Sequence, residues 1–110
     1  MAENKYLRPS WDDYFMEVAD AIASALVTEH LAACVNILPG ACSVYEWQGR
    51  LNRDQEMVLL LKTRSDRLTA LEVRLLELHP YELPELIVVP VVGGLAPYLS
   101  WIETQLDKNK

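Results

Sequence analysis

The sequence predicts a single α+β domain, and three observations support that fold class. Stretches with apolar residues at helical spacing alternate with short apolar stretches of the kind that form β-strands. The chain has 110 residues, of which 51% are hydrophobic, and this is enough for one modest core. No segment rich in proline, glycine or serine separates two parts, so residues 1–110 are expected to form one domain.

The first predicted element is a helix over residues 11–30. Its apolar side chains recur at the spacing of one helix face, as shown by Phe15, Val18, Ile22, Ala25 and Leu26. Ser10 and Asp13 have the spacing of a capping pair, so the helix is expected to begin near Trp11.

Two strands are predicted next, and they should pair as a long hairpin. Residues 32–38 are apolar with a β-leaning composition, and Pro39-Gly40 is expected to end that strand. Residues 43–47 alternate small or charged with large side chains, and residues 48–54 have the polar composition of a turn. Residues 57–61 are apolar on both faces, which is typical of a central or interface strand.

The second half of the chain predicts a helix, a strand and a last helix. Ser65 can cap a helix that ends at His79, because a residue before proline avoids helical geometry. Residues 86–91 have the composition of a strand, which the following glycine pair ends. Pro97 suits the first turn of the last helix, and residues 107–110 are expected to be a frayed tail.

With one strand before the first helix, this order is the βαββαβ arrangement of ferredoxin-like proteins, followed by an additional C-terminal helix. The only candidate for that first strand is residues 5–8, directly before a proline that cannot donate a ladder hydrogen bond. The first strand is therefore expected to be atypical.

Composition and charge argue against several classes of partner. The 16 acidic residues exceed the 10 basic ones, the net charge is −6, and the acidic residues occur along the whole chain. The sequence contains no basic patch that could bind a nucleic acid or an anionic membrane. The longest apolar stretch, residues 86–92, is far shorter than the roughly 20 residues of a membrane-spanning helix. The N-terminal residues lack the pattern of a secretion signal, so a cytoplasmic location is expected.

The sequence favours a protein without catalytic activity or an organic cofactor. It contains none of the nucleophile, nucleotide-binding or zinc-protease motifs. The spacing of Cys34 and Cys42 matches neither a redox motif nor a zinc knuckle, and it predicts two free thiols in a reducing compartment. A Cys34 and His79 pair assembled in space is the least favoured reading.

The densest polar stretch, residues 79–85, is a candidate metal site. His79 offers an imidazole nitrogen and Glu82 and Glu85 offer carboxylates, while Cys34 could add a thiolate. This donor set suits Cu(II), Zn(II) or another divalent cation. The alternative is structural, with His79 and Glu82 satisfying backbone groups where a helix ends.

A second set of side chains could bind a ligand or form a subunit interface. Lys62 follows a strand, where it could face a ligand or mark the exit to solvent. The aromatic members could line a pocket, although aromatic residues at strand spacing more often lie in a core or an interface: Tyr45, Trp47, Tyr81, Tyr98 and Trp101.

Five stretches together resemble the CutA1 family, the divalent-cation tolerance proteins: LAACVNILPG at 31–40, SVYEWQG at 43–49, LLKT at 60–63, HPYELPE at 79–85 and YLSW at 98–101. The resemblance implies a ferredoxin-like subunit in a tight homotrimer similar to the PII signalling proteins. It also implies a cytoplasmic protein linked to tolerance of divalent metals, copper above all.

Residues 1–13 depart from the family pattern and form an atypical N-terminal segment. In some members the copper ligands are a cysteine at the end of the first strand and histidines at the His-Pro-Tyr motif. Only His79 carries over to this chain, so weak metal binding is expected. The alternative is a trimeric PII-like module that binds a small ligand or a partner protein at clefts between subunits.

Overall fold

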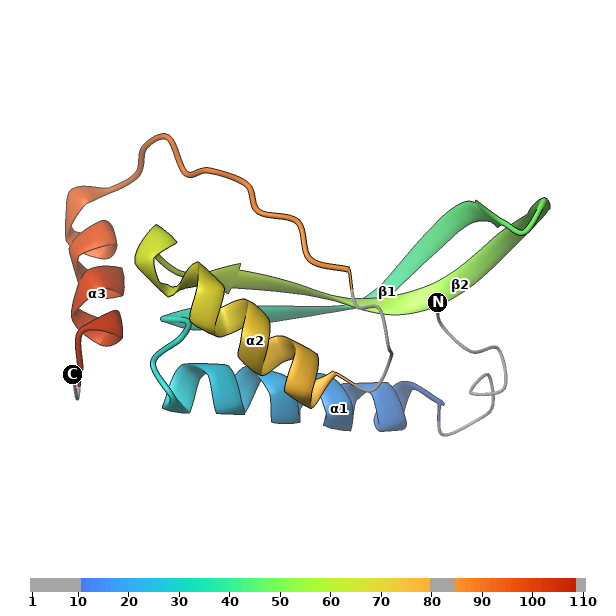
Figure 1. Cartoon of the computed structure of the whole chain (residues 1–110), viewed down its shortest axis with the longest axis horizontal. Helices are drawn as coiled ribbons and strands as arrows, with labels where there is room; N and C mark the ends of the chain where they lie inside the picture. The colour runs from blue at the N-terminus through green and yellow to red at the C-terminus, as the bar shows by residue number, and fades with distance from the viewer. Residues whose placement is uncertain (1–10, 80–84, 109–110) are drawn as a thin grey trace.

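The protein has an α+β fold, as the sequence predicts, with helices packed against a β-hairpin (Figure 1). The structure is a computed structural model that describes residues 11–79 and 85–108. Its elements, in chain order, are α1 (Trp11–Thr28), β1 (Cys34–Trp47), β2 (Arg50–Lys62), α2 (Leu68–Leu78) and α3 (Ala96–Leu106). No helix in these ranges is long and apolar enough to cross a membrane.

The core lies where α1 and α2 pack together on the hairpin (Figure 1). Its buried residues are Ile22 and Leu26 from α1, Ala32 from the connection to β1, and Leu71 and Leu75 from α2. The two helices present these residues because each has apolar side chains at the spacing of one face. The predicted helix over residues 11–30 is thus confirmed, while the proposed capping residue Ser10 lies outside the described residues.

The hairpin is longer and more continuous than expected. β1 and β2 pair antiparallel from Cys34 opposite Lys62 to Trp47 opposite Arg50. The expectation that Pro39-Gly40 ends a strand is wrong, because these residues form an irregularity within β1, between the paired residues Leu38 and Ala41. Gly40 has a φ of +84°, which a glycine adopts without strain, so the ladder resumes beyond it.

The turn of the hairpin is also tighter than expected. Only Gln48 and Gly49 connect the strands, and residues 50–54, predicted as part of a polar turn, begin β2. Both turn residues have positive φ angles, 52° and 76°, as two-residue hairpin turns require. The polar residues here occupy strand positions, of which Arg50 and Arg53 are exposed and Asp54 is buried.

The helix predicted after Ser65 is confirmed, but its start differs. Ser65 opens a single 3₁₀ turn, Ser65–Arg67, and neither that turn nor α2 has a side-chain cap. α2 ends at Leu78, and the N–H of His79 donates to the Leu75 carbonyl at 2.8 Å. The backbone of His79 is extended, as expected of a residue before proline.

The predicted strand over residues 86–91 is absent. These residues run as an extended segment above the hairpin in Figure 1, and among the described residues the sheet has only β1 and β2. A strand is defined by its hydrogen-bonded partner, and composition alone cannot supply one. The candidate first strand, residues 5–8, lies outside the described residues, and so the full βαββαβ order is not observed.

Polar contacts from two arginines that lie just before α2 hold α3 in place. Arg64 pairs with Asp107 at 2.8 Å and with Glu103 at 3.8 Å, and Arg67 donates to the Leu106 carbonyl at 2.5 Å. The side chain of Leu106, the last residue of α3, is completely buried. The predicted last helix is confirmed, with its proline in the first turn.

Candidate functional site

The predicted metal ligands do not converge in the described structure. His79 is half-buried at the C-terminal end of α2, and Glu85 is exposed. Cys34 is half-buried and lies opposite Lys62, which precedes α2. Cys34 therefore lies toward the N-terminal end of α2, whereas His79 follows its C-terminal end. An 11-residue helix is about 16 Å long, so the two side chains are far apart.

Residues 11–79 and 85–108 contain no group of three or more histidine, cysteine, aspartate or glutamate side chains that could hold a metal ion. Tyr81 and Glu82 lie outside the described residues. The donors that remain near one another in sequence are His79 and Glu85. Cys34 and Cys42 are both free thiols, as predicted.

A different set of predicted residues does converge, at the open end of the hairpin. The Lys62 ammonium donates to the Tyr98 hydroxyl at 3.2 Å and lies 5.4 Å from the centre of the same ring. The Tyr98 and Trp101 rings stack with centres 5.5 Å apart. We call these three residues the Lys62–Tyr98–Trp101 cluster.

The cluster joins two elements that are distant in sequence. Lys62 ends β2, whereas both aromatic residues lie on α3, where three-residue spacing puts them on one face. The rings are each 40% exposed, so a ligand could reach them. The hydrogen bond to Tyr98 raises the pKa of Lys62 above its ordinary value, and the neighbouring Cys34 acts in the same direction.

Tyr45 and Trp47 lie elsewhere, toward the turn of the hairpin. Trp47 is 54% exposed. Tyr45 is half-buried, and its hydroxyl donates to the carboxylate of Asp54, which is almost fully buried. Two residues before Tyr45 on the same strand, the Ser43 hydroxyl donates to the Glu56 carboxylate at 3.0 Å.

Sequence reasoning missed Asp54 because the residue was assigned to a polar turn. The hairpin register provides the signal that was lacking, since Tyr45 pairs with Asn52 and Asp54 is therefore its diagonal neighbour.

Comparison with known proteins decides the family. The family model described as CutA1 divalent ion tolerance protein matches residues 15–105. The chain belongs to the CutA1 family. It is 50% identical over 86 residues to the divalent-cation tolerance protein CutA of Thermus thermophilus, a match that covers 78% of this chain and 84% of the relative.

Other CutA1 relatives extend the comparison. The CutA homolog of Xenopus laevis is 47% identical over 85 residues, which are 77% of this chain but 56% of that protein. The chain thus spans about half the length of this relative, and about half of the mouse protein CutA, of which 49% is covered at 44% identity.

Solved CutA1 structures have the same fold. The CutA structure from Xylella fastidiosa superposes with a TM-score of 0.79 at 50% identity and covers 83% of this chain and 88% of that one. CutA1 from Oryza sativa gives a TM-score of 0.80 at 40% identity, with 84% and 85% covered. The resemblance seen in the sequence is therefore confirmed, and residues 1–14 lie outside the matched family region.

Proposed function

We propose that this chain serves divalent-cation tolerance by binding Cu(II) or another divalent cation weakly, with His79 as the principal ligand. The single observation that carries the proposal is the match of residues 15–105 to the divalent ion tolerance family. The Thermus and Pectobacterium relatives are named divalent-cation tolerance proteins.

The donor set supports weak rather than tight binding. An imidazole nitrogen and the carboxylate of Glu85 are ligands that suit Cu(II) and Zn(II). Capping of α2 holds the backbone of His79, so its side chain starts from a defined position. Cys34 and Glu82 are the further candidates, although Cys34 belongs to the other end of α2.

Titration calorimetry with Cu(II) and with Zn(II) tests the assignment. We expect His79→Asn to bind at least tenfold more weakly than the unsubstituted protein, because the principal nitrogen ligand is lost. The matched control is His30→Asn, since the chain has two histidines and His30 has a φ of +60°, which asparagine tolerates. Equal binding by the two variants would contradict a role for His79.

Cys34→Ser, Glu82→Gln and Glu85→Gln extend the same titration to the other proposed ligands. A variant that loses affinity identifies a ligand. If His79→Asn has an effect and these three have none, His79 acts with ligands other than those proposed.

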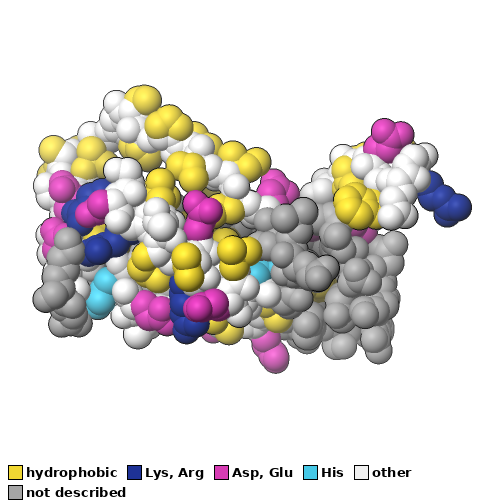
Figure 2. Space-filling model, in the orientation of Figure 1, with side chains coloured by type: hydrophobic (Ala, Val, Ile, Leu, Met, Phe, Trp, Pro, Cys, Tyr) yellow, Lys and Arg dark blue, Asp and Glu magenta, His cyan; other side chains and the backbone are white. Residues whose placement is uncertain are grey.

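We further propose that the protein acts as a homotrimer, without a catalytic step, in the cytoplasm. The support for self-association is the exposed apolar surface on the hairpin, which includes Val44, Trp47, Leu51 and Leu60, each more than half exposed. Exposed apolar surface often marks contacts between proteins, and Figure 2 shows apolar side chains exposed at the tip of the hairpin, at the upper right. Light scattering should give about three times the 12.5 kDa subunit mass, and a monomer at micromolar concentration would contradict the proposal.

The Lys62–Tyr98–Trp101 cluster favours a second function, a module that binds a small anionic ligand. An ammonium group can pair with an anion, and two stacked, partly exposed rings offer a surface for a planar group. A screen of small anionic metabolites by thermal shift tests it, since a ligand that binds the folded state raises the melting temperature. The shift should disappear in Lys62→Gln and persist in Lys108→Gln, a lysine beyond α3.

A further inference from the structure

Three consecutive residues where β2 ends direct their side chains to alternate sides. The Lys62 ammonium and the Arg64 guanidinium both reach α3. The Thr63 hydroxyl between them donates to the Leu31 carbonyl at 2.7 Å. The backbone of Arg64 is extended, and side chains two residues apart in an extended chain lie on one side. The chain thus presents two cations to α3, which stands beside the start of α2 in Figure 1.

The two cations contact α3 at places that are far apart along the helix. Lys62 contacts Tyr98 in the first turn of α3. Arg64 pairs with Glu103 and Asp107 at the other end. Helix geometry puts the Tyr98 and Asp107 positions roughly 13 Å apart along the axis. Because a helix is stiff, contacts at two distant points fix its direction, so the ion pairs at the C-terminal end determine where the aromatic end lies.

The Arg64 guanidinium is itself held in a defined direction. Its Nε and Nη2 donate to the two carboxylate oxygens of Asp66 at 2.7 and 3.1 Å, which is the bidentate geometry of an arginine fork. Nη2 also donates to Asp107 at 2.8 Å. α3 has no basic residue in its last turn. Arg64 and Arg67, which donates to the Leu106 carbonyl, therefore supply the positive charge that stabilises a helix C-terminus.

We propose that Arg64 is a positioning residue for the Lys62–Tyr98–Trp101 cluster, because its ion pairs with α3 hold the two aromatic rings beside the Lys62 ammonium. The inference rests on the second proposed function for its ligand, and it names the class. A planar aromatic carboxylate can pair its charge with Lys62 and place its ring against Trp101. The position of the rings can be measured without any ligand.

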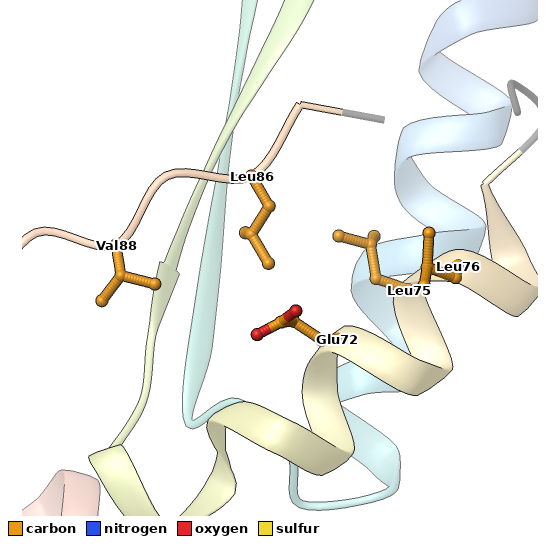
Figure 3. A pocket seen from close by; sticks show the side chains of 5 residues that line it. All are labelled: Glu72, Leu75, Leu76, Leu86 and Val88. Atoms are coloured by element: carbon orange, nitrogen blue, oxygen red, sulfur yellow. The ribbon is translucent and has the colours of Figure 1, made fainter. Parts of the chain in front are cut away.

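The cluster suits an anion better than the hollow between α2 and residues 86–88 does. That hollow has a volume of about 220 Å³ and is lined by Glu72, Leu75, Leu76, Leu86 and Val88. Figure 3 shows the Glu72 carboxylate directed into the hollow, and no basic side chain of the described residues lines it. A carboxylate in a mostly apolar space repels an anion. An anionic ligand therefore has its place at the cluster.

Fluorine NMR of protein labelled with 5-fluorotryptophan measures the environment of Trp101. The chain has three tryptophans, and the spectrum of Trp101→Phe assigns the resonance. We expect Arg64→Gln to move the Trp101 resonance toward its position in the urea-unfolded protein, because the ring loses its stack with Tyr98 when α3 is released. Arg64→Lys should recover part of that change, since lysine keeps the charge but not the fork.

Arg74→Gln is the matched control. Arg74 is also a partly exposed arginine that pairs with two carboxylates, but its partners, Glu29 and Glu77, lie just after α1 and on α2. Both variants should lower the urea midpoint, whereas only Arg64→Gln should shift the Trp101 resonance. Equal shifts in the two variants, or no shift in Arg64→Gln, would overturn the proposal, because Arg64 would then contribute stability alone.

Salt tests whether the ion pairs act through charge. The side chains of Glu103 and Asp107 are each more than half exposed, so about 1 M NaCl, with a Debye length of about 3 Å, screens their attraction to Arg64. The Trp101 resonance of the unsubstituted protein should move toward that of Arg64→Gln as NaCl rises from about 0.05 M to about 1 M. An equal salt response in Arg64→Gln would overturn the proposal.

Indole-3-carboxylate is the ligand probe, titrated by calorimetry. Its dissociation constant should rise about two- to fivefold in Arg64→Gln, the range for partly exposed ion pairs, and stay unchanged in Arg74→Gln. Lys62→Gln should abolish the binding. An unchanged affinity in Arg64→Gln would overturn the proposal. If the unsubstituted protein does not bind the probe while Arg64→Gln still shifts the Trp101 resonance, the function as a module for planar carboxylates is wrong and the positioning role of Arg64 stands.

Discussion

At the scale of single residues, the buried carboxylate of Asp54 depends on one phenol. Asp54 is 5% exposed, and the Tyr45 hydroxyl donates to it across the hairpin. A buried polar group that loses its partner costs about 1–3 kcal/mol, because its desolvation is no longer compensated. We therefore expect Tyr45→Phe to lower the free energy of unfolding by that amount.

Urea unfolding of Tyr45→Phe measures this effect, and Ser43→Ala is the control. Ser43 donates to the less buried Glu56, where water can replace it, so its loss should cost less. An equal or larger effect of Ser43→Ala would show that burial of Asp54 does not determine the cost.

The Lys62–Tyr98 hydrogen bond makes a pH-dependent contribution to stability. It raises the pKa of Lys62 above 10.5 in the folded protein, because it favours the charged ammonium. The contribution is therefore present in full below the unfolded pKa and is lost as the pH rises through the folded pKa. The window lies at and above about pH 10.5.

Tyr98→Phe tests this dependence, since it removes the acceptor and keeps the aromatic ring. We expect the unsubstituted protein to have the higher urea midpoint near neutral pH. The difference should shrink once the pH exceeds that window. A difference that stays constant or grows at alkaline pH would contradict the assigned role of Lys62.

The sequence singled out all three members of that cluster as candidate ligand or interface residues, but not their contact. Lys62 and Tyr98 are 36 residues apart, and no periodic pattern reports such a distance. Their meeting depends on the position of α3, which Arg64 and Arg67 hold through long-range polar contacts. Composition predicts helices because they depend on local spacing, whereas docking of a terminal helix depends on single side chains.

At the scale of elements, the hairpin turn contains one residue that fits poorly. Gln48 has a φ of +52°, a conformation that costs most L-residues about 1–2 kcal/mol and that asparagine adopts more readily. Gln48→Asn creates the Asn-Gly pair preferred in such turns. We expect it to raise the free energy of unfolding by up to about 1 kcal/mol, measured by urea unfolding.

Gly49→Ala tests the neighbouring position, whose φ is +76°, by replacing a residue that tolerates this conformation with one that does not. It should destabilise the protein by about 1–2 kcal/mol, although the position has open space for a methyl group. A neutral Gly49→Ala would show that the turn can adopt another conformation, and it would remove the reason for the gain from Gln48→Asn.

Strand positions were predicted well and strand ends poorly. Apolar residues at 32–38 and 57–61 indicated the hairpin because burial imposes their pattern. Pro39-Gly40 misled because the same two residues can end a strand or form an irregularity within one, and only the partner strand decides. The strand predicted over 86–91 failed for the same reason, since pairing is not encoded in the segment itself.

At the scale of the whole molecule, the exposed apolar surface has two separate parts, the hairpin and the extended segment of residues 86–91. The proposed homotrimer uses the first, so its disruption should depend on where a charge is placed. Leu51 is 63% exposed on β2 and lies opposite Glu46. A lysine at position 51 would face that carboxylate, so Leu51→Lys should not destabilise the hairpin itself. Ile87→Lys puts the same charge at a residue that is 73% exposed on the extended segment.

We expect Leu51→Lys to lower the mass measured by light scattering at micromolar concentration toward 12.5 kDa, because an unpaired ammonium would be buried between subunits. Ile87→Lys should keep the mass of the unsubstituted protein. The melting temperature of the unsubstituted protein should also rise with its concentration, and that dependence should vanish in Leu51→Lys. If Ile87→Lys dissociates the assembly and Leu51→Lys does not, the extended segment is the subunit contact and the hairpin is the surface left free.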